Sequence, residues 1–182
     1  AVNKVFRGLA SQYYGPEESL FPLKEKPWIA TLDTFAIGGG CQYLLVMDHI
    51  IAEKGSYMTL PARKEGIIPG MANLRLWRFT GDRIARQAIQ NGLTIHSDST
   101  EGKLICDEII EKGTMDEKLL KTIDAYTNSG VVGSASNRRA FRIGQEPLDI
   151  FRKYMSAYCH DQAYCHFSDA LIKNLEHYWN AA

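Results

Sequence analysis

The sequence lacks both an excess of charge of one sign and a long apolar run. Its 21 Lys and Arg residues balance 21 Asp and Glu residues, so no net field would attract nucleic acid or an anionic membrane surface. The longest apolar runs, such as 43–47, fall far short of the roughly 20 residues that span a bilayer. We therefore expect no nucleic-acid partner and no membrane-spanning segment.

Paired cysteines and clustered histidines are also missing. No two cysteines form a CxxC pair, and residues 1–12 lack the basic-then-apolar layout of a signal peptide, so we expect reduced thiols and a cytoplasmic location. The histidines show no HxH, HxxxH or two-histidine-one-carboxylate spacing, which argues against a metal site. The residues concerned are Cys41, Cys106, Cys159, Cys165, His49, His96, His160, His166 and His177.

What is present is a globular composition in which strands and helices alternate. Of the 182 residues, 45% are hydrophobic and 23% are charged, which fits one mid-sized domain. Strands are predicted at 28–32, 50–52, 57–60 and 104–110. Helices are predicted at 41–48, 73–80 and 82–91, the last with Asp82 as its N-cap and Gly92 at its end. This alternation predicts an α/β fold.

After Gly113 the pattern changes to helices alone. They are predicted at 116–126, 136–143 and 147–178. Leu171 and Leu175 share one helix face at i and i+4, and we expect them to close an apolar substrate pocket. The tail is too aromatic for a solvated helix, so it should pack against the core or a neighbouring subunit. Its aromatic residues include Tyr154, Tyr158, Tyr164, Phe167, Tyr178 and Trp179.

Three consecutive glycines, 38–40, stand between the first strand and the first helix. Glycine lets a backbone approach a ligand closely, and the amides of a helix N-terminus favour an anion. The spacing fits neither GxGxxG nor GxxxxGK[ST], which argues against dinucleotide and NTP binding. Taken alone, the turn is equally compatible with tight packing and no ligand.

The glycines belong to a longer series of motifs. The segment 35–42 (FAIGGGCQ) is followed in order by Met47-Asp48, Ile51-Ala52, Leu60-Pro61 and 65–70 (EGIIPG). This series resembles the crotonase (enoyl-CoA hydratase/isomerase) superfamily. The resemblance implies a spiral of ββα turns, assembly into trimers or hexamers, and an acyl-CoA substrate. It also implies that the thioester oxygen sits between two backbone amides, the second being that of Gly39, which would stabilise an enolate.

Two departures from the hydratase pattern bear on the reaction. Hydratases of this superfamily carry a glutamate where this chain has Gln42, and a second one where it has Ala62. An amide and a methyl group cannot exchange a proton with substrate, so ordinary hydration is disfavoured.

The segments 60–70 and 72–76, together with Gln42, resemble the subfamily of 3,5-dihydroxyphenylacetyl-CoA 1,2-dioxygenases. That resemblance implies a cofactor-independent reaction, in which an arylacetyl-CoA carbanion reacts with O2 to give an arylglyoxylate and CoA. Gln42 would lie beside the reacting carbon, and Ile67 would line an apolar O2 pocket. The other substrate-binding residues implied by the same motifs are Gly38, Gly40, Pro69 and Gly70.

The first oxyanion amide of this superfamily comes from a stretch upstream of the equivalent of Trp28, and residues 6–26 contain no match to it. We therefore expect 1–115 to be the C-terminal part of a crotonase core and 116–182 to be a helical region for oligomerisation and site closure. The N-terminal part of the core would lie outside this chain, in a longer protein or on a second polypeptide. Two alternatives stay open: another crotonase reaction (isomerisation, hydration or thioester hydrolysis), or a non-catalytic subunit.

Overall fold

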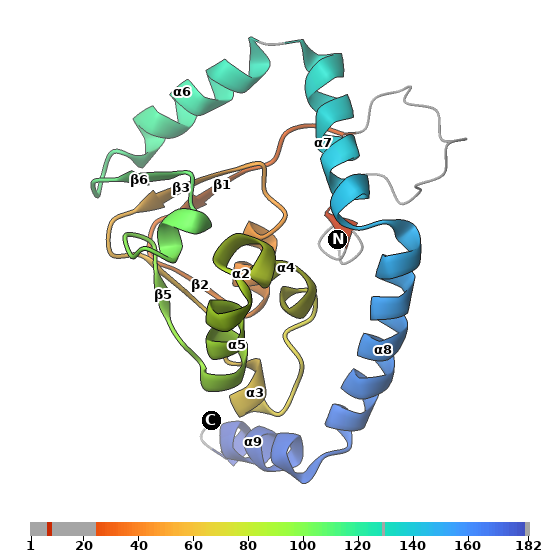
Figure 1. The fold of residues 1–182 in the computed structure, drawn as a ribbon. Coiled ribbons are helices and arrows are strands. Elements are labelled where there is room, and N and C mark those ends of the chain that lie inside the picture. The colour runs from red at the N-terminus through yellow and green to blue at the C-terminus, as the bar shows by residue number, and fades with distance from the viewer. Residues whose placement is uncertain (1–6, 9–24, 129, 181–182) are drawn as a thin grey trace.

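The computed structural model describes residues 7–8, 25–128 and 130–180. Its strands form two three-stranded sheets, ordered β1-β3-β6 and β2-β4-β5 (Figure 1). The first sheet is parallel, and in the second β5 runs antiparallel to β4. The strands are β1 (Ile29–Leu32), β2 (Phe35–Ile37), β3 (His49–Glu53), β4 (Tyr57–Thr59), β5 (Ile95–His96) and β6 (Glu108–Ile110).

The two strands of each β-β-α unit lie in different sheets. Short links join β1 to β2 and β3 to β4, and in each pair the first strand lies in one sheet and the second in the other. Helix α2 (Gly39–Leu44) follows the first pair, and α3 (Ala62–Glu65) follows the second. This repeated β-β-α unit is the predicted spiral, so the α/β class is confirmed. The stretch 6–26, which contains no match to the loop that supplies the first oxyanion amide, lies almost wholly outside the described residues.

The hydrophobic core lies between the two sheets and the helices that pack on them. The central strand β3 has no accessible surface at Ile51 and Ala52, as expected for a parallel strand covered on both faces. Leu44 of α2, Leu76 of α4 (Ala72–Thr80) and Ile89 of α5 (Asp82–Asn91) complete the same cluster.

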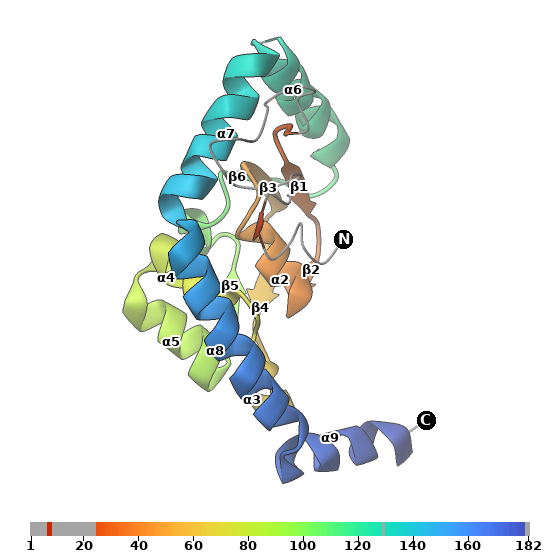
Figure 2. The ribbon, with the colours of Figure 1, turned by 90° about the vertical axis from the view of Figure 1, so that its right-hand side faces the viewer.

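The last four helices wrap around this core. Helices α6 (Met115–Thr127) and α7 (Val131–Gln145) lie along one end, α8 (Leu148–His166) runs down one side, and α9 (Asp169–Asn180) turns beneath the core (Figures 1 and 2). A 3-10 turn, η1 (Gly102–Leu104), precedes β6. None of the helices in the described ranges is both long and apolar enough to cross a membrane.

Three predicted boundaries are wrong for local reasons. Helix α2 begins at Gly39 and ends at Leu44, so it is shorter than 41–48 and includes two of the glycines. Gly81, not Asp82, is the N-cap of α5, and the Asp82 carboxylate instead accepts a hydrogen bond from Arg86 Nε at 2.7 Å. The apolar run 104–110 forms a strand only from Glu108, because Gly102 packs its backbone against the His96 carbonyl and holds the 3-10 turn.

The predicted single helix over 147–178 is also wrong, because the chain breaks at Ser168. Its hydroxyl donates to the Cys165 carbonyl at 2.7 Å and accepts from the Leu171 amide at 3.3 Å. A serine that accepts from an amide three residues ahead acts as a helix N-cap. The break therefore ends α8 and starts α9 in a new direction.

The tail aromatics are only partly covered by their own chain. Tyr154 and Tyr158 are half-buried and stack in parallel, with ring centroids 6.3 Å apart. Tyr164, Phe167 and Trp179 are 78%, 84% and 83% exposed, so the prediction that they pack against the core of this chain is wrong. Their burial against a neighbouring subunit stays a prediction, and the Tyr178 side chain lies outside the described residues.

A buried carboxylate fastens the tail to the core. Glu146, at the end of α7, is 1% exposed and accepts hydrogen bonds from Arg75 and Arg78 of α4 and from Arg142 of α7. Two of these bonds come from Arg75, at 2.7 and 2.8 Å. Burial alone would raise the pKa of Glu146, but the hydrogen bonds and charges of Arg75 and Arg142 outweigh it and hold the pKa at about 2.

Replacing Glu146 with Gln should destabilise the fold by about 3–5 kcal/mol, because three guanidinium groups would lose their buried counter-charge. The measurement is the free energy of unfolding in urea. Glu117→Gln, which breaks the exposed pair with Lys121, is the control and should cost less than about 1 kcal/mol. Equal losses in the two variants would contradict the role assigned to Glu146.

The same cluster predicts a pH dependence. The pKa of Glu146 is lowered from 4.5 in the unfolded chain to about 2 in the folded protein. The ionised carboxylate therefore stabilises the fold fully above pH 4.5, and this stabilisation is lost as the pH falls towards 2. The free energy of unfolding in urea should therefore fall more steeply between pH 5 and 2 in the wild-type protein than in Glu146→Gln. Parallel curves would refute the assignment.

Candidate active site

The glycine turn brings a run of backbone amides to the start of α2. Gly38 is the N-cap, with φ 54° and ψ −110°, a conformation that favours glycine. Its amide donates to the Thr59 carbonyl at 2.9 Å, and its carbonyl accepts from the Gln42 amide at 3.1 Å. The amides of Gly39 and Gly40 lie in the first turn, where a helix supplies no internal acceptor, and both residues are exposed. The turn thus offers donors to an approaching oxygen atom.

The Gln42 side chain joins this turn to the loop that precedes α4. Its Oε1 accepts a hydrogen bond from the Met71 amide at 3.0 Å. Gly70 has φ 47°, and a Cβ at that position would overlap Gln42 Oε1. The structure therefore brings together two predicted site residues, Gln42 and Gly70. Sequence reasoning missed Met71, because it acts through a backbone amide that no side-chain pattern reveals.

The predicted loop residues lie between α3 and α4. The Ile67 amide donates to the Ala62 carbonyl at 2.9 Å, and the Gly70 amide donates to the Ile68 carbonyl at 2.8 Å. Ile67 is half-buried, whereas Pro69 and Gly70 are buried. The loop thus places two partly accessible aliphatic residues, Ile67 and Ile68, close in sequence to the Gln42 contact.

The helical tail lies against this loop. Leu171 of α9 packs so close to Gly66 that a Cβ on the glycine would lie 3.0 Å from the Leu171 nitrogen. Leu175 is one turn further on and is 50% exposed. The tail also contributes polar contacts that sequence reasoning missed, from Tyr154 and Gln162 of α8 and Asn174 of α9. The spacing of Tyr154, Tyr158 and Gln162 by four residues was the available signal, since it places them on one helix face.

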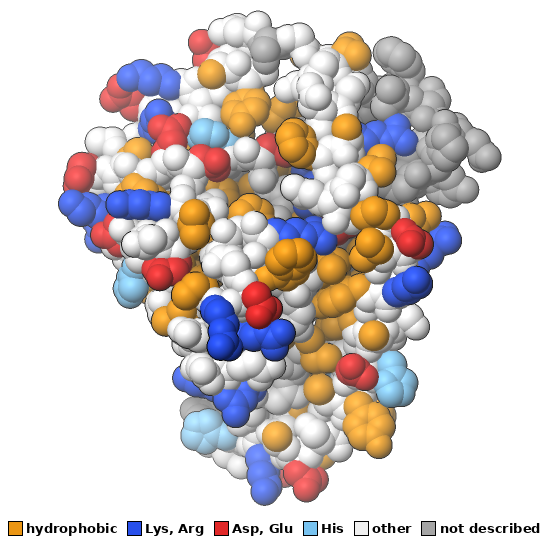
Figure 3. Space-filling view, in the orientation of Figure 1, with side chains coloured by type: hydrophobic (Ala, Val, Ile, Leu, Met, Phe, Trp, Pro, Cys, Tyr) orange, Lys and Arg blue, Asp and Glu red, His pale blue; other side chains and the backbone are white. Residues whose placement is uncertain are grey.

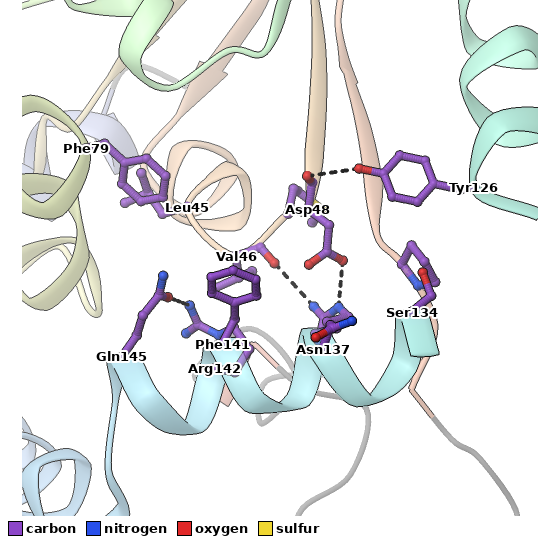
Figure 4. A pocket seen from close by; sticks show the side chains of 13 residues that line it. Leu45, Val46, Asp48, Phe79, Tyr126, Ser134, Asn137, Phe141, Arg142 and Gln145 are labelled. Carbon is purple, nitrogen blue, oxygen red and sulfur yellow. Dashed lines mark hydrogen bonds and ion pairs between the residues drawn. The ribbon is translucent and has the colours of Figure 1, made fainter. Parts of the chain in front are cut away.

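A separate cavity of about 370 Å³ lies between α7 and the segment that follows α2 (Figure 4). None of the predicted site residues lines it. Arg138 enters it and is already paired, with Asp48 at 2.6 Å and Glu25 at 3.2 Å, and its guanidinium lies 4.1 Å from the Trp28 ring centre. We therefore place the candidate site at the glycine turn and not in this cavity.

The Cys41 and Cys106 thiols are both buried. Burial raises the pKa of both Cys41 and Cys106 to about 12, so neither forms a thiolate nucleophile near neutral pH. In the described ranges, no group of three or more His, Cys, Asp and Glu side chains is arranged to hold a metal ion.

Comparisons with known proteins agree with this geometry. The family model for enoyl-CoA hydratase/isomerase matches residues 17–147. A (3,5-dihydroxyphenyl)acetyl-CoA 1,2-dioxygenase from Amycolatopsis orientalis is 41% identical over 162 residues, which are 89% of this chain. The chain spans only 36% of the length of that relative.

Solved structures share the fold at low sequence identity. An enoyl-CoA hydratase from Mycobacterium avium subsp. paratuberculosis matches with a TM-score of 0.76 and 16% identity, over 85% of this chain and 63% of the other. A carnitinyl-CoA dehydratase from Mycobacterium avium matches with a TM-score of 0.72 and 18% identity, over 95% of this chain and 70% of the other. The predicted resemblance is confirmed: the chain belongs to the enoyl-CoA hydratase/isomerase (crotonase) family.

Proposed function

We propose that the protein carrying this chain is a cofactor-independent dioxygenase that acts on an arylacetyl-CoA thioester similar to 3,5-dihydroxyphenylacetyl-CoA. The observation that carries the proposal is Gln42, a neutral amide held by the Met71 amide at 3.0 Å, where hydratases keep a carboxylate. The 41% identity to a dioxygenase of this class supports the same reading.

The glycine turn supplies the electrostatic part of the reaction. A thioester carbonyl oxygen placed at the Gly39 amide would become an enolate oxygen when the neighbouring methylene gives a proton to a base. Gln42 and Ala62 cannot act as that base, so we propose that it lies in the N-terminal part of the core, outside the described residues. A preorganised amide stabilises the negative charge of the enolate, and one such donor is worth roughly 3 kcal/mol in other enzymes. We propose that the first oxyanion amide, which pairs with that of Gly39, comes from outside the described residues, in the N-terminal part of the core.

The atoms balance without water or a cofactor. The carbanion of ArCH2CO-SCoA gives electrons to O2, the α-carbon and the acyl carbon each gain one oxygen atom, and the C–S bond breaks. The products are ArCOCO2H and CoA-SH, which retain both methylene hydrogens. The substrates of this proposal are thus the thioester and O2, with no metal, flavin or other cofactor.

Gln42 suits this chemistry because its side-chain amide can donate a hydrogen bond but carries no charge. Its Oε1 is engaged by Met71, so its Nε2 hydrogens are the groups available to a developing enolate. Ala62, the position of the second hydratase carboxylate, is 4% exposed and offers only a methyl group. A site with these two residues stabilises a carbanion and does not activate water.

Ile67 supplies the apolar part of the site. A dry aliphatic surface holds O2 without polar contacts and keeps water from the carbanion. We propose that Ile67, with Leu171 and Leu175 of the tail, forms this surface. Residues 116–182 would then close the site and carry the contacts of a trimer or hexamer, whereas 1–115 form the C-terminal part of the core.

Oxygen uptake by the full-length protein tests the function. The protein is loaded without oxygen with 3,5-dihydroxyphenylacetyl-CoA and EDTA, and O2 is then admitted. We expect one O2 consumed per CoA released, with 3,5-dihydroxyphenylglyoxylate as the other product. CoA release without O2 would indicate a thioesterase, and activity lost with EDTA and restored by iron would contradict the cofactor-free mechanism.

Gln42→Glu should slow oxygenation at least about tenfold, because a carboxylate beside the carbanion repels it. The carboxylate can still accept the Met71 N–H, so the fold should survive. The rate of O2 uptake is compared with that of Gln87→Glu, a control on the exposed face of α5. Efficient hydration of crotonyl-CoA by the wild-type protein would contradict the claim that a site with Gln42 and Ala62 does not activate water.

Ile67→Thr should raise the apparent KM for O2 roughly threefold while the KM for the thioester changes less, because the new hydroxyl brings water into an apolar surface. Ile67→Val, which stays apolar, is the control and should retain the wild-type value. Both variants are assayed only if their melting temperatures match the wild type. An unaltered O2 dependence in folded Ile67→Thr would remove Ile67 from the site.

A further inference from the structure

Three polar side chains of the tail bind one short stretch of the core, residues 64–70. Gln162 Oε1 accepts from the Ile68 amide at 2.9 Å, Tyr154 Oη donates to the Gly70 carbonyl, and Asn174 Nδ2 donates to the Lys64 carbonyl at 2.8 Å. These partners are 84 to 110 residues apart in sequence. In the space-filling view, hydrophobic side chains gather along the seam between α8 and the core (Figure 3).

The loop needs such support because glycines flank it. Gly66 has φ 80° and Gly70 has φ 47°, so a flexible residue stands at each end. Between them, the acceptor for the Ile68 amide is a side chain of α8, whereas the Ile67 amide donates to the Ala62 carbonyl of α3 and the Gly70 amide to the Ile68 carbonyl. The position of the middle of the loop therefore depends on the tail.

The Tyr154 contact is suited to a permanent role. Burial raises the pKa of Tyr154 to about 12, so the phenol stays protonated and remains a donor throughout the neutral range. Its ring stacks on Tyr158 at an interplanar angle of 5°, which fixes the direction of the hydroxyl. Tyr154, Tyr158 and Gln162 thus lie together on one face of α8.

The loop transmits its position to Gln42. Gly70 lies directly against Gln42 Oε1, and the next residue, Met71, donates to that oxygen. A shift of Gly70 would therefore move the Gln42 side-chain amide, which faces the substrate in the proposed function. We propose that Tyr154 and Gln162 are positioning residues, which set the 67–70 loop against Gln42 and so control turnover. This inference rests on the proposed function.

Gln162→Leu tests the tether in the full-length protein. Loss of one hydrogen bond should speed exchange of the Ile68 amide about fivefold, and kcat for O2 uptake should fall by a similar factor while the KM for the thioester stays within about twofold. Gln162→Glu keeps an acceptor for the same N–H and should restore both values. Amide exchange is followed by NMR or mass spectrometry without substrate.

Tyr154→Phe provides a second variant in case Gln162→Leu folds poorly. It should speed exchange of the Gly70 and Met71 amides and lower kcat, whereas Tyr164→Phe, at a 78% exposed position on the same helix, should change neither. Unchanged exchange in both tether variants, or faster exchange with an unchanged kcat, would overturn the proposal. If the wild-type protein consumes no O2, the proposed function fails, and calorimetric binding of 3,5-dihydroxyphenylacetyl-CoA replaces kcat in the same comparison.

Discussion

The hydrogen bond between the Met71 amide and Gln42 Oε1, at 3.0 Å, is the contact on which the candidate site depends. It joins the end of the glycine turn to the start of α4, two elements that follow the neighbouring parallel strands β2 and β4 of one sheet. It also fixes the orientation of the Gln42 amide, because the Met71 N–H can donate only to the oxygen of that side chain and not to its NH2 group. Gly70 is required beside it, since any side chain there would displace Gln42.

Helix α4 connects this contact to the buried charges of the tail. The Arg75 amide donates to the Met71 carbonyl one turn along the helix, and the Arg75 guanidinium holds Glu146. The α7–α8 junction is thereby fixed to the helix that begins at the site. With that junction fixed, α8 runs where Tyr154 and Gln162 reach the 67–70 loop. The buried ion cluster and the site are parts of one connected arrangement.

Sequence reasoning predicted the features that local pattern determines. The glycine turn, the helices 73–80 and 82–91, the helix end at Gly92 and the all-helical tail follow from periodicity and turn residues, and they are present. It failed where individual contacts override the pattern: the Ser168 side chain caps a new helix and divides the tail, and the close packing of Gly102 against the His96 carbonyl delays β6. Motif resemblance singled out Gln42 and Gly70. It could not find Met71, Gln162 or Tyr154 as partners, because those contacts form between segments far apart in sequence.

The central claim is that the glycine turn and Gln42 stabilise a carbanion beside the thioester. Exchange of the substrate's methylene hydrogens tests it most directly, and it does so without O2. The full-length protein is incubated with 3,5-dihydroxyphenylacetyl-CoA in D2O under anaerobic conditions, and deuterium in the recovered thioester is measured by mass spectrometry. The account predicts deuterium at the methylene carbon, at a rate at least equal to that of O2 uptake and lowered in Gln42→Glu. Recovery of unlabelled thioester from a protein that turns over normally once O2 is admitted would contradict it.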